Sequence, residues 1–462
     1  MKKVDLIIIG AGPGGYETTL AAAKSGLATV LIEKSQIGGT CLNEGCIPTK
    51  CFCRSAEVME DIAAAGNYGI KTGPPLPDMK DIVSRKNDTI KALGESVAAL
   101  LKRNAVTVIS GTAMFIDSHT VKVVPPDDTE QTKDELIFQA SHIIIATGSS
   151  TKPLAVPGNK SPGVITSKEL LEIDHVPSRL CIVGGGVIGM EFASIFHAFG
   201  SQVTVLEFCK EILPNIDSDI AKRLRTTMKG KGVTVVTQAR VEEIKAAPDG
   251  SLTVHYTHKG VTAQEVSADV VVSAVGRMAN VGSLNLDQVG VTYTAKGITV
   301  NGNMQTSVPS IYAIGDVNGL CQLAHAASFQ GRRALHHICG KADTLQLDVM
   351  PAAVFTSPEI ASVGLTEETA RAQGLEIRIG KSFFRANGKA LAMGAPDGMV
   401  KLIAGTDGGI VGCPMMGAHA ADLIQEITAL MRFDATVNDL CEIVHAHPTL
   451  GEAVLDAARN MI

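Results

Sequence analysis

Residues 4–34 read VDLIIIGAGPGGYETTLAAAKSGLATVLIEK, and residues 178–208 read SRLCIVGGGVIGMEFASIFHAFGSQVTVLEF. Both stretches show an apolar run, a glycine-rich turn, a helical stretch that stops at a glycine, and a second apolar run that leads to an acid. The three turn glycines are Gly10, Gly12 and Gly15 in the first copy and Gly184, Gly186 and Gly189 in the second. The chain therefore uses one folding unit twice.

Each copy has the order of a Rossmann-like βαβ unit, which binds a dinucleotide. The first glycine permits the tight turn, the second lets the backbone approach a pyrophosphate, and the third lets the helix pack on the strand. The helix N-terminus then faces the phosphates with its N–H groups and the positive end of its dipole. Glu33 and Glu207, each twenty-three residues after the first glycine, can accept hydrogen bonds from ribose hydroxyls. The alternative is a turn that only packs helix on sheet, but two copies in register favour two dinucleotide sites.

The composition is that of a globular chain with more than one core. It has 462 residues, of which 45% are hydrophobic and 19% charged, and about three domains is the expectation at this length. A net charge of −6 without a Lys/Arg-rich run argues against nucleic acid as a partner. No segment reaches the roughly 18 apolar residues of a membrane span. Most cysteines are scattered singly, as in a reducing compartment, so we expect a cytoplasmic protein with no membrane contact.

Residues 38–50, GGTCLNEGCIPTK, hold Cys41 and Cys46 with four residues between them. A disulfide here closes a small loop and removes little entropy from the unfolded chain. A five-residue helical step rises about 7.5 Å, whereas a disulfide needs Cα atoms within about 7 Å. A bridge would therefore require a distorted first helical turn and would be easily reduced. The pair is better suited to redox chemistry than to stabilising the fold.

Further landmarks divide the chain into four parts. HIIIATGSS (142–150) reads as an apolar strand that ends in glycine, and VVVSAVGR (270–277) as a second. SIYAIGDV (310–317) places Asp316 at the carboxyl end of a strand, where open α/β sheets bind ligands. From about Asp348 the pattern changes to antiparallel strands followed by helices over 418–431 and 437–440. We predict an α/β chain with Rossmann-like domains at 1–150 and 151–275, a central domain at 276–346 and a C-terminal α+β domain at 347–462.

These residues together resemble the two-dinucleotide flavoprotein disulfide reductases, essentially from end to end. The family motif GGTCxNxGCxPxK stands at residues 38–50, its ATG strand end at 146–148 and its GD motif at 315–316. The interface-domain signature stands as PAAVFTSPEIASVGLTE (351–367), and the His-Pro-Thr…Glu motif as HAHPTLGE (445–452). Their joint occurrence makes the resemblance specific.

The resemblance implies that the first Rossmann-like domain, completed by the central domain, holds a tightly bound, non-covalent FAD, and that the second holds NAD. It also implies a homodimer whose C-terminal dimerisation domains complete each other's active sites, and no metal. The residues implied for FAD are Gly10, Gly12, Gly14, Gly15, Glu33, Lys50, Thr147, Gly148, Asp316 and Ala324. Those implied for NAD are Gly184, Gly186, Gly189, Glu207 and Gly276.

The resemblance also gives the two cysteines different roles. Cys41 is expected to exchange with the substrate dithiol, and Cys46 to face the flavin and pass electrons to it. A helix N-terminus would favour their thiolates. Lys50 is expected beside the flavin, paired with Glu191 after the second glycine turn. The alternative for the two cysteines is a pair of buried thiols that never form a disulfide. The alternative for Lys50 is a surface lysine, and that for Glu191 is an ordinary helical carboxylate.

His447 is the expected general base, because imidazole can take a proton from a thiol near neutral pH. Glu452 is expected to orient and polarise it. His445, two residues earlier, is the competing histidine, and the Pro-Thr that follows His447 favours the latter.

Three residues near the redox pair depart from the family pattern. Cys51 and Cys53 stand where apolar or small residues are expected, and two residues apart on a helix they point to different faces. We interpret them as core residues, with an auxiliary thiol that exchanges with Cys46 as the alternative. Glu44, between the redox cysteines, carries a charge that could disfavour the thiolates.

Glu207 favours one branch of the family, because its carboxylate would repel the 2′-phosphate of NADP. Mercuric and thioredoxin reductases of this size also carry a C-terminal cysteine pair, whereas this chain ends AARNMI. The resemblance therefore implies NAD-linked oxidation of protein-bound dihydrolipoamide through a Cys41–Cys46 disulfide and FAD, with hydride transfer to NAD⁺. The expected partners are lipoyl domains of 2-oxoacid dehydrogenase complexes or the glycine cleavage H protein. The alternatives are an NAD(P)H-dependent reductase of another disulfide, similar to glutathione or mercuric reductase, and a flavin-bearing docking subunit without activity.

Overall fold

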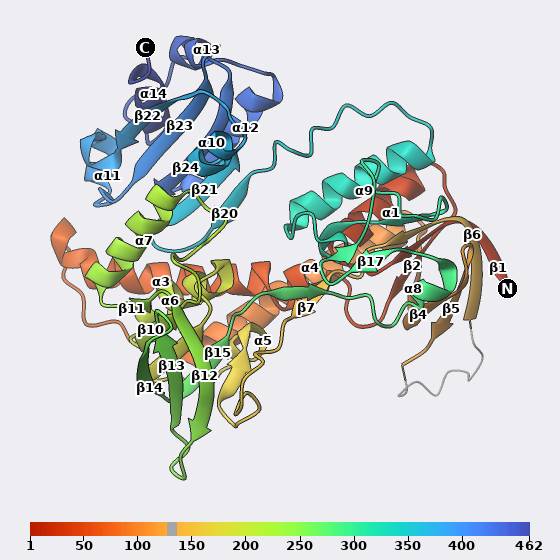
Figure 1. Ribbon diagram of the computed structural model, residues 1–462, viewed down its shortest axis with the longest axis horizontal. Helices are drawn as coiled ribbons and strands as arrows, with labels where there is room; N and C mark the ends of the chain where they lie inside the picture. Colours follow the sequence, from red (N-terminus) through yellow and green to blue (C-terminus); the bar gives the residue numbers. More distant parts are fainter. Residues whose placement is uncertain (127–135) are drawn as a thin grey trace. The chain divides into compact units, whose positions relative to one another are not determined.

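The computed structural model describes residues 1–126 and 136–462, and these divide into two compact units (Figure 1). The first unit consists of residues 1–49, 84–152 and 276–347, and the second of residues 50–83, 153–275 and 348–462. Each unit is thus assembled from three stretches of chain. The four domain boundaries given above remain a prediction.

The first repeat forms the centre of the main sheet of the first unit. Strand β1 (Lys2–Ile9) pairs in parallel with β2 (Thr29–Glu33) on one side and with β6 (Leu136–Ile145) on the other. The run from Leu6 to Ile9 is buried throughout, as expected for a parallel strand covered on both faces. Within the described residues the strand order is β3 (Thr107–Ser110), β2, β1, β6, β5 (Thr120–Val124) and β4 (Thr112–Asp117), with β19 (Ile311–Ala313) also on β6.

Helix α1 (Pro13–Lys24) follows the first glycine turn and lies beside α9 (Ala324–Ile338) (Figure 1). The close approach depends on Gly14, because a Cβ there would lie 2.9 Å from the Cβ of Ala327. The other helical segments of this unit are α2 (Gly39–Asn43), most of α4 (Met79–Arg103), α8 (Leu286–Val289) and the 3₁₀ turn η2 (Gly315–Asn318). Short strand pairs join β7 (Ser149–Thr151) to β16 (Arg277–Ala279) and β17 (Tyr293–Thr294) to β18 (Gly297–Ile298).

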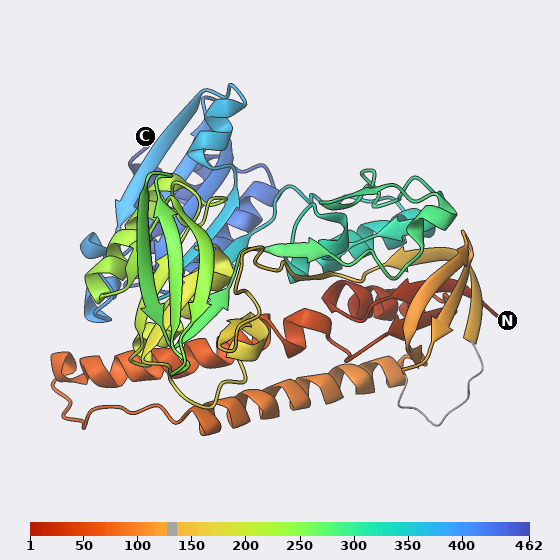
Figure 2. The same cartoon turned by 60° about the horizontal axis from the view of Figure 1, so that its bottom comes forward.

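The second repeat forms a corresponding parallel sheet in the second unit. Its described strands run in the order β11 (Thr234–Val236), β10 (Gln202–Leu206), β9 (Arg179–Val183), β15 (Val270–Ser273) and β8 (Val164–Thr166). Helix α6 (Val187–Ala198) follows the second glycine turn and is buried from Gly189 to Phe196. The antiparallel strands β12 (Ala239–Ala246), β13 (Leu252–His258) and β14 (Thr262–Ala268) form a separate sheet (Figure 2). The other helices here are α3 (Cys46–Ala64), which starts in the first unit, α5 (Ser167–Leu170) and α7 (Ser218–Lys231).

The C-terminal stretch has the α+β architecture that the sequence predicts. Its antiparallel sheet runs β20 (Ala352–Val354), β21 (Glu359–Gly364), β24 (Ile410–Gly417), β23 (Met399–Gly405) and β22 (Ile377–Phe383). The two predicted helices are confirmed as α12 (Ala420–Arg432) and α13 (Val437–Glu442). The chain also forms α10 (Glu367–Ala372), α11 (Gly388–Ala392) and α14 (Glu452–Arg459).

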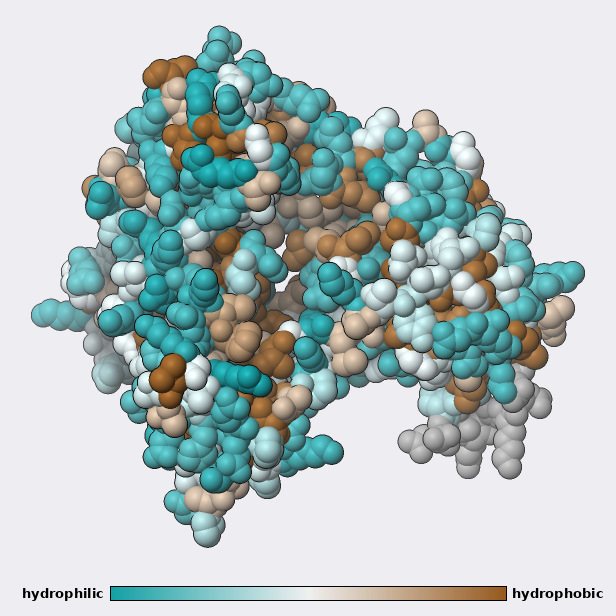
Figure 3. Space-filling view, in the orientation of Figure 1, coloured by the Kyte–Doolittle hydropathy of each residue, from teal (hydrophilic) through white to brown (hydrophobic). Residues whose placement is uncertain are grey.

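Hydrophilic residues are spread over much of the face shown in Figure 3, with smaller apolar patches between them. Among the described helices, none combines the length and the apolar character that crossing a membrane requires.

Candidate active site

The first glycine turn has the geometry that its spacing predicts. Gly10 has a φ of +104°, and a Cβ there would lie 2.3 Å from the carbonyl oxygen of Ala146. A Cβ on Gly15 would lie 1.8 Å from the carbonyl oxygen of Gly10, so the helix can approach the strand only without a side chain. Gly12, in contrast, has no atom within 4 Å of its ideal Cβ position. Two glycines thus allow close packing, and the one between them leaves space at the helix N-terminus.

The second turn repeats this division of roles. Gly184 has a φ of +113°, and its ideal Cβ would lie 2.3 Å from the carbonyl oxygen of Ala274. The Cβ of residue 189 would lie 1.9 Å from the carbonyl oxygen of Gly184, whereas Gly186 again faces open space. The repeat seen in the sequence is therefore a repeat of backbone geometry.

Both helix N-termini suit a phosphate group. Helices α1 and α6 have no side-chain cap and no acidic residue in the first turn, so no protein carboxylate competes there for the N–H groups. Glu33 accepts hydrogen bonds from the N–H groups of Ala11 (2.6 Å) and Ser35 (2.8 Å). Glu207 likewise accepts from Gly185 (2.5 Å) and Cys209 (2.6 Å). Both acids therefore lie against the glycine turns, where they can bind a ribose, and the residues fit two dinucleotides.

A polar network surrounds Asp316 in the first unit. Asp316 lies in η2, and its Oδ2 accepts a hydrogen bond of 2.5 Å from the hydroxyl of Ser149. Arg277 donates to the hydroxyl (2.7 Å) and to the backbone carbonyl (2.6 Å) of Ser149. Arg277 is within 3.9 Å of Asp316. Sequence reasoning missed Ser149 and Arg277, although both directly follow glycines that it singled out.

The other residues expected near the cofactors lie at element ends. Thr147 donates its hydroxyl hydrogen to the carbonyl of Asn280 (2.8 Å) and accepts the side-chain amide of Asn280 at its own carbonyl (3.0 Å). Gly148 and Gly276 both have positive φ, at +67° and +108°, and open space at their ideal Cβ positions. Ala324 is the first residue of α9. Their contacts with a cofactor remain a prediction.

The two redox-candidate cysteines lie on either side of a break between helices. Cys41 is in α2, which ends at Asn43, and the exposed Cys46 begins α3. Glu44 has φ −136° and ψ 7°, outside the helical range. A continuous helix would separate the two residues too far for a bridge. The break removes that constraint, and the disulfide itself remains a prediction.

Lys50 and Glu191 form the ion pair expected from the sequence. The Nζ of Lys50 lies 3.0 and 3.1 Å from the two carboxylate oxygens of Glu191, whose side chain is only 6% exposed. The N–H of Phe355 donates to the same carboxylate (2.9 Å), and its ring centroid is 4.2 Å from Nζ. Phe355 was missed because no local pattern connects it with Glu191, 164 residues away.

The two additional cysteines of α3 are buried, as the interpretation of them as core residues predicts. Cys51 and Cys53 are each 7% exposed. Burial, and then the nearby carboxylate of Glu191, raise the pKa of Cys53 to about 12. Its Sγ lies 3.5 Å from the carbonyl oxygen of Phe355. Cys53 therefore remains a thiol near neutral pH, which disfavours the alternative of thiolate exchange.

His447 and Glu452 form the expected couple. Nδ1 of His447 lies 2.9 Å from Oε1 of Glu452, and Oε2 accepts the N–H of Thr449 at 2.9 Å. The hydrogen bond from Thr449, and then that from His447, lower the pKa of Glu452. A charged carboxylate makes Nδ1 the protonated nitrogen, so Nε2 carries the lone pair. The ring is 80% exposed and can meet a substrate proton.

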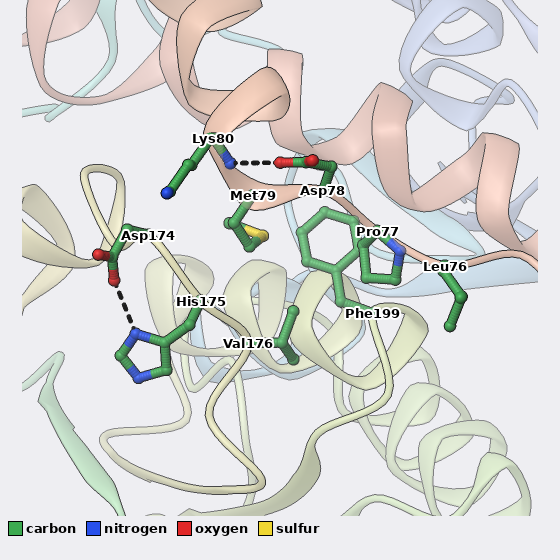
Figure 4. A pocket seen from close by; sticks show the side chains of 9 residues that line it. All are labelled: Leu76, Pro77, Asp78, Met79, Lys80, Asp174, His175, Val176 and Phe199. Atoms are coloured by element: carbon green, nitrogen blue, oxygen red, sulfur yellow. Dashed lines mark hydrogen bonds and ion pairs between the residues drawn. The ribbon is translucent and has the colours of Figure 1, made fainter.

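A hollow of about 740 Å³ lies elsewhere in the second unit (Figure 4). Lys80, Asp174 and His175 border an apolar floor formed by Met79 and Phe199, and Asp174 accepts from the histidine ring. None of the site residues expected from the sequence lines it. The glycine turns and the cysteine segment, rather than this hollow, define the candidate active site.

Residues 4–331 match the pyridine nucleotide-disulphide oxidoreductase family, and residues 350–458 match the dimerisation domain of that family. The chain belongs to this family. It is an oxidoreductase, its fold class is confirmed, and members of the family use FAD and NAD. The dimerisation domain supports a homodimer.

Relatives named dihydrolipoyl dehydrogenase match the chain along nearly its full length. The one from Mycobacterium bovis is 40% identical over 470 residues, covering 100% of this chain and 99% of the relative. Those from Chlamydia muridarum and Bacillus subtilis are 39% and 38% identical, covering 98% and 99% of this chain and 96% and 98% of the relatives.

Solved structures of similar flavoproteins superpose over the whole chain. LpdA from Mycobacterium tuberculosis has a TM-score of 0.91 at 28% identity, with 100% of both chains covered. A Cu(II) complex of the HOCl-induced flavoprotein disulfide reductase RclA from Escherichia coli has a TM-score of 0.87 at 29% identity, with 99% of both covered.

Proposed function

We propose that this family member oxidises protein-bound dihydrolipoamide to lipoamide and reduces NAD⁺. The observation that carries the proposal is the His447–Glu452 couple, whose hydrogen bond leaves Nε2 as the base that a dithiol substrate requires. The full-length similarity to dihydrolipoyl dehydrogenases supports the substrate class. The expected partners are the lipoyl domains of 2-oxoacid dehydrogenase complexes or the glycine cleavage H protein. The scattered cysteines support a cytoplasmic location.

The dithiol half of the reaction uses protein side chains only, with Cys41 and Cys46 from one subunit and His447 from its partner in the expected homodimer. Nε2 of His447 takes a proton from one substrate thiol, and the resulting thiolate attacks Cys41 of the Cys41–Cys46 disulfide. The new mixed disulfide releases Cys46 as a thiolate. The second substrate thiol then attacks the substrate sulfur of the mixed disulfide, releasing Cys41 and closing the lipoamide disulfide. The substrate loses two electrons to the cysteine pair, and its two protons pass to Nε2 of His447 and to the departing sulfur of Cys41.

Bound FAD would supply a two-electron acceptor for the reduced cysteine pair, and NAD⁺ would accept the two electrons as a hydride. Gly10, Gly12, Gly14, Gly15 and Glu33 are proposed to hold the adenosine and pyrophosphate of FAD, and Asp316 its flavin side. The second glycine turn and Glu207 are proposed to hold NAD in the same way.

Lys50 and Glu191 are proposed to set the charge beside the redox pair. Glu191 is buried and receives hydrogen bonds from both Lys50 and Phe355, so the lysine is held in one position. A cation beside the thiols would favour the thiolate that must leave the mixed disulfide, and this is the role proposed for Lys50.

The test is to measure NADH formation from dihydrolipoamide and NADPH oxidation by glutathione disulfide with the same FAD-loaded enzyme. We expect the first reaction to dominate, and a dominant second reaction would assign the chain to the glutathione-reductase type instead. His447→Gln should lower kcat for dihydrolipoamide by roughly 10²–10⁴. His175→Gln is a matched control, since His175 is another exposed histidine whose Nδ1 contacts a carboxylate. NADH oxidation by ferricyanide, which bypasses the dithiol step, should be unchanged in both variants.

A further inference from the structure

A second histidine–carboxylate pair lies two residues before His447. Nε2 of His445 is 2.9 Å from Oε1 of Glu426 on α12, and its Nδ1 is 3.0 Å from the carbonyl oxygen of Ile443. The His445 side chain is only 7% exposed, in contrast to the 80% exposure of His447. The two histidines of the motif are therefore built for different tasks.

Hydrogen-bonding chemistry determines the charge of this pair. The carbonyl of Ile443 can only accept, so Nδ1 must carry a hydrogen. In a neutral ring Nε2 would then present a lone pair to a carboxylate oxygen 2.9 Å away, which is repulsive. The Nε2–Oε1 contact has the distance of an ion pair but not the direction of a hydrogen bond, and among the described residues Nε2 has no hydrogen-bond partner. Only opposite charges make so close an approach favourable, which points to an imidazolium facing a carboxylate.

The pair joins the loop of the proposed base to the body of the C-terminal domain. Glu426 lies on α12, which packs on β21 and β24, and the loop then leads through His447 to Glu452 at the start of α14. Among the described residues, His445 faces Glu426 directly and interacts electrostatically with Glu452, which also binds His447, and Cys413 on β24 lies near Glu426. His445 also contributes to the lowered pKa of Glu452, after the larger effects of Thr449 and His447.

We propose that His445 and Glu426 are positioning residues: a buried imidazolium–carboxylate pair that fixes the loop carrying the His447–Glu452 couple. This inference rests on the proposed function for its kinetic consequence, but the charge of His445 can be tested without any substrate. Neither residue touches the substrate in this proposal, so their loss changes the position of the base rather than substrate binding.

The kinetic test compares Glu426→Gln and Glu426→Ala with Asp422→Asn in the FAD-loaded enzyme. Asp422 lies one turn earlier on the same helix with a side chain that is 89% exposed, so its variant should match the unmodified enzyme. The two Glu426 variants should lower kcat for dihydrolipoamide at least tenfold with KM changed less than threefold, because a small displacement of a base costs rate. NADH oxidation by ferricyanide should persist, which shows that the variants fold and hold both cofactors. Wild-type kcat in Glu426→Ala would overturn the proposal.

The substrate-independent test is ¹⁵N NMR of histidine-labelled protein at pH 7.5, with the His445 signals assigned from their loss in His445→Gln. Both ring nitrogens should be protonated in the unmodified protein, and one should lose its proton in Glu426→Gln. One unprotonated nitrogen in the unmodified protein would refute the charge assignment. If the enzyme does not oxidise dihydrolipoamide at all, the proposed function fails, while the NMR result still decides whether the charged pair exists.

Discussion

Lys401 is a buried cation in β23, and its replacement by methionine should destabilise the second unit. Its side chain is 1% exposed, and Nζ lies within 3.0 Å of Asp217, Asp219 and Glu367. Burial lowers the pKa of Lys401, but the carboxylates, with Glu367 first, outweigh this effect and raise it above its ordinary value. Lys401 therefore carries its charge at neutral pH.

The expected loss of stability follows from the buried carboxylate that Lys401→Met would leave without its cation. Asp217 is fully buried, caps the N-terminus of α7 and contacts Lys401 through both oxygens. Removing one member of a buried ion pair costs about 3–5 kcal/mol because the other charge remains without compensation. With a urea m-value of about 3 kcal/mol/M, the unfolding midpoint of Lys401→Met should fall by about 1–2 M. Asp217→Asn in the same chain should recover at least half of the loss.

Lys381 provides the matched control. It pairs with Lys401 across β22 and β23 and contacts Asp219 at 2.7 Å, but its side chain is 39% exposed. An exposed ion pair contributes about 1 kcal/mol or less, so Lys381→Met should shift the midpoint by less than about 0.4 M. The measurement is the midpoint of the far-UV circular dichroism transition, compared between variants at equal FAD. Equal shifts for the two lysine variants, or none for Lys401→Met, would refute the reasoning.

The pH dependence gives a second check on the same cluster. The hydrogen bond from Lys381, followed by that from Lys401, lowers the pKa of Asp219 to about 2. A carboxyl whose folded pKa is depressed stabilises the protein above its ordinary pKa of about 3.9, and this contribution is lost as the pH falls toward 2. The difference in urea midpoint between Lys401→Met and the unmodified protein should therefore be constant from pH 8 to 5 and shrink below about pH 4.

The remaining predictions concern the proposed reaction. Cys41→Ser should keep a Cys46 thiolate beside the oxidised flavin and show a long-wavelength absorbance without reduction, whereas Cys46→Ser should not; identical spectra would contradict the separate roles. Glu207 should make NAD strongly preferred over NADP, because like charges at close range cost several kcal/mol, and the preference should weaken in Glu207→Gln. Equal kcat/KM for the two cofactors in the unmodified enzyme would exclude this. Mixing nearly inactive Cys41→Ser and His447→Gln homodimers should restore about half of the activity after subunit exchange, since one of the two composite sites is then intact. Activity that stays at the parental level, with heterodimers confirmed by differential tagging, would show that thiol and base belong to one subunit.

The sequence by itself determined the two dinucleotide-binding units, because their requirements are local. Gly10 and Gly184 adopt positive φ, which favours glycine. At Gly15 and Gly189 the helix lies so close to the strand that no side chain fits. Both requirements place glycines at fixed positions along the chain. The cysteine spacing was equally readable, since four intervening residues already decide whether a regular helix can bridge the pair. The helices at 420–432 and 437–442 followed from patterns within a single segment.

Only the tertiary structure decided which side chains from distant segments meet. Phe355 reaches Glu191, Arg277 reaches Ser149, and Lys401 reaches Asp217 across 128 or more residues of chain. These contacts depend on which elements the fold brings together, and no spacing of residues along the sequence predicts them. The two histidines of HAHPTLGE illustrate the limit: their order along the chain cannot tell which is exposed and which is buried. That difference arises because Glu426 on α12 lies against His445, whereas His447, in the loop before α14, contacts the first residue of that helix and stays exposed.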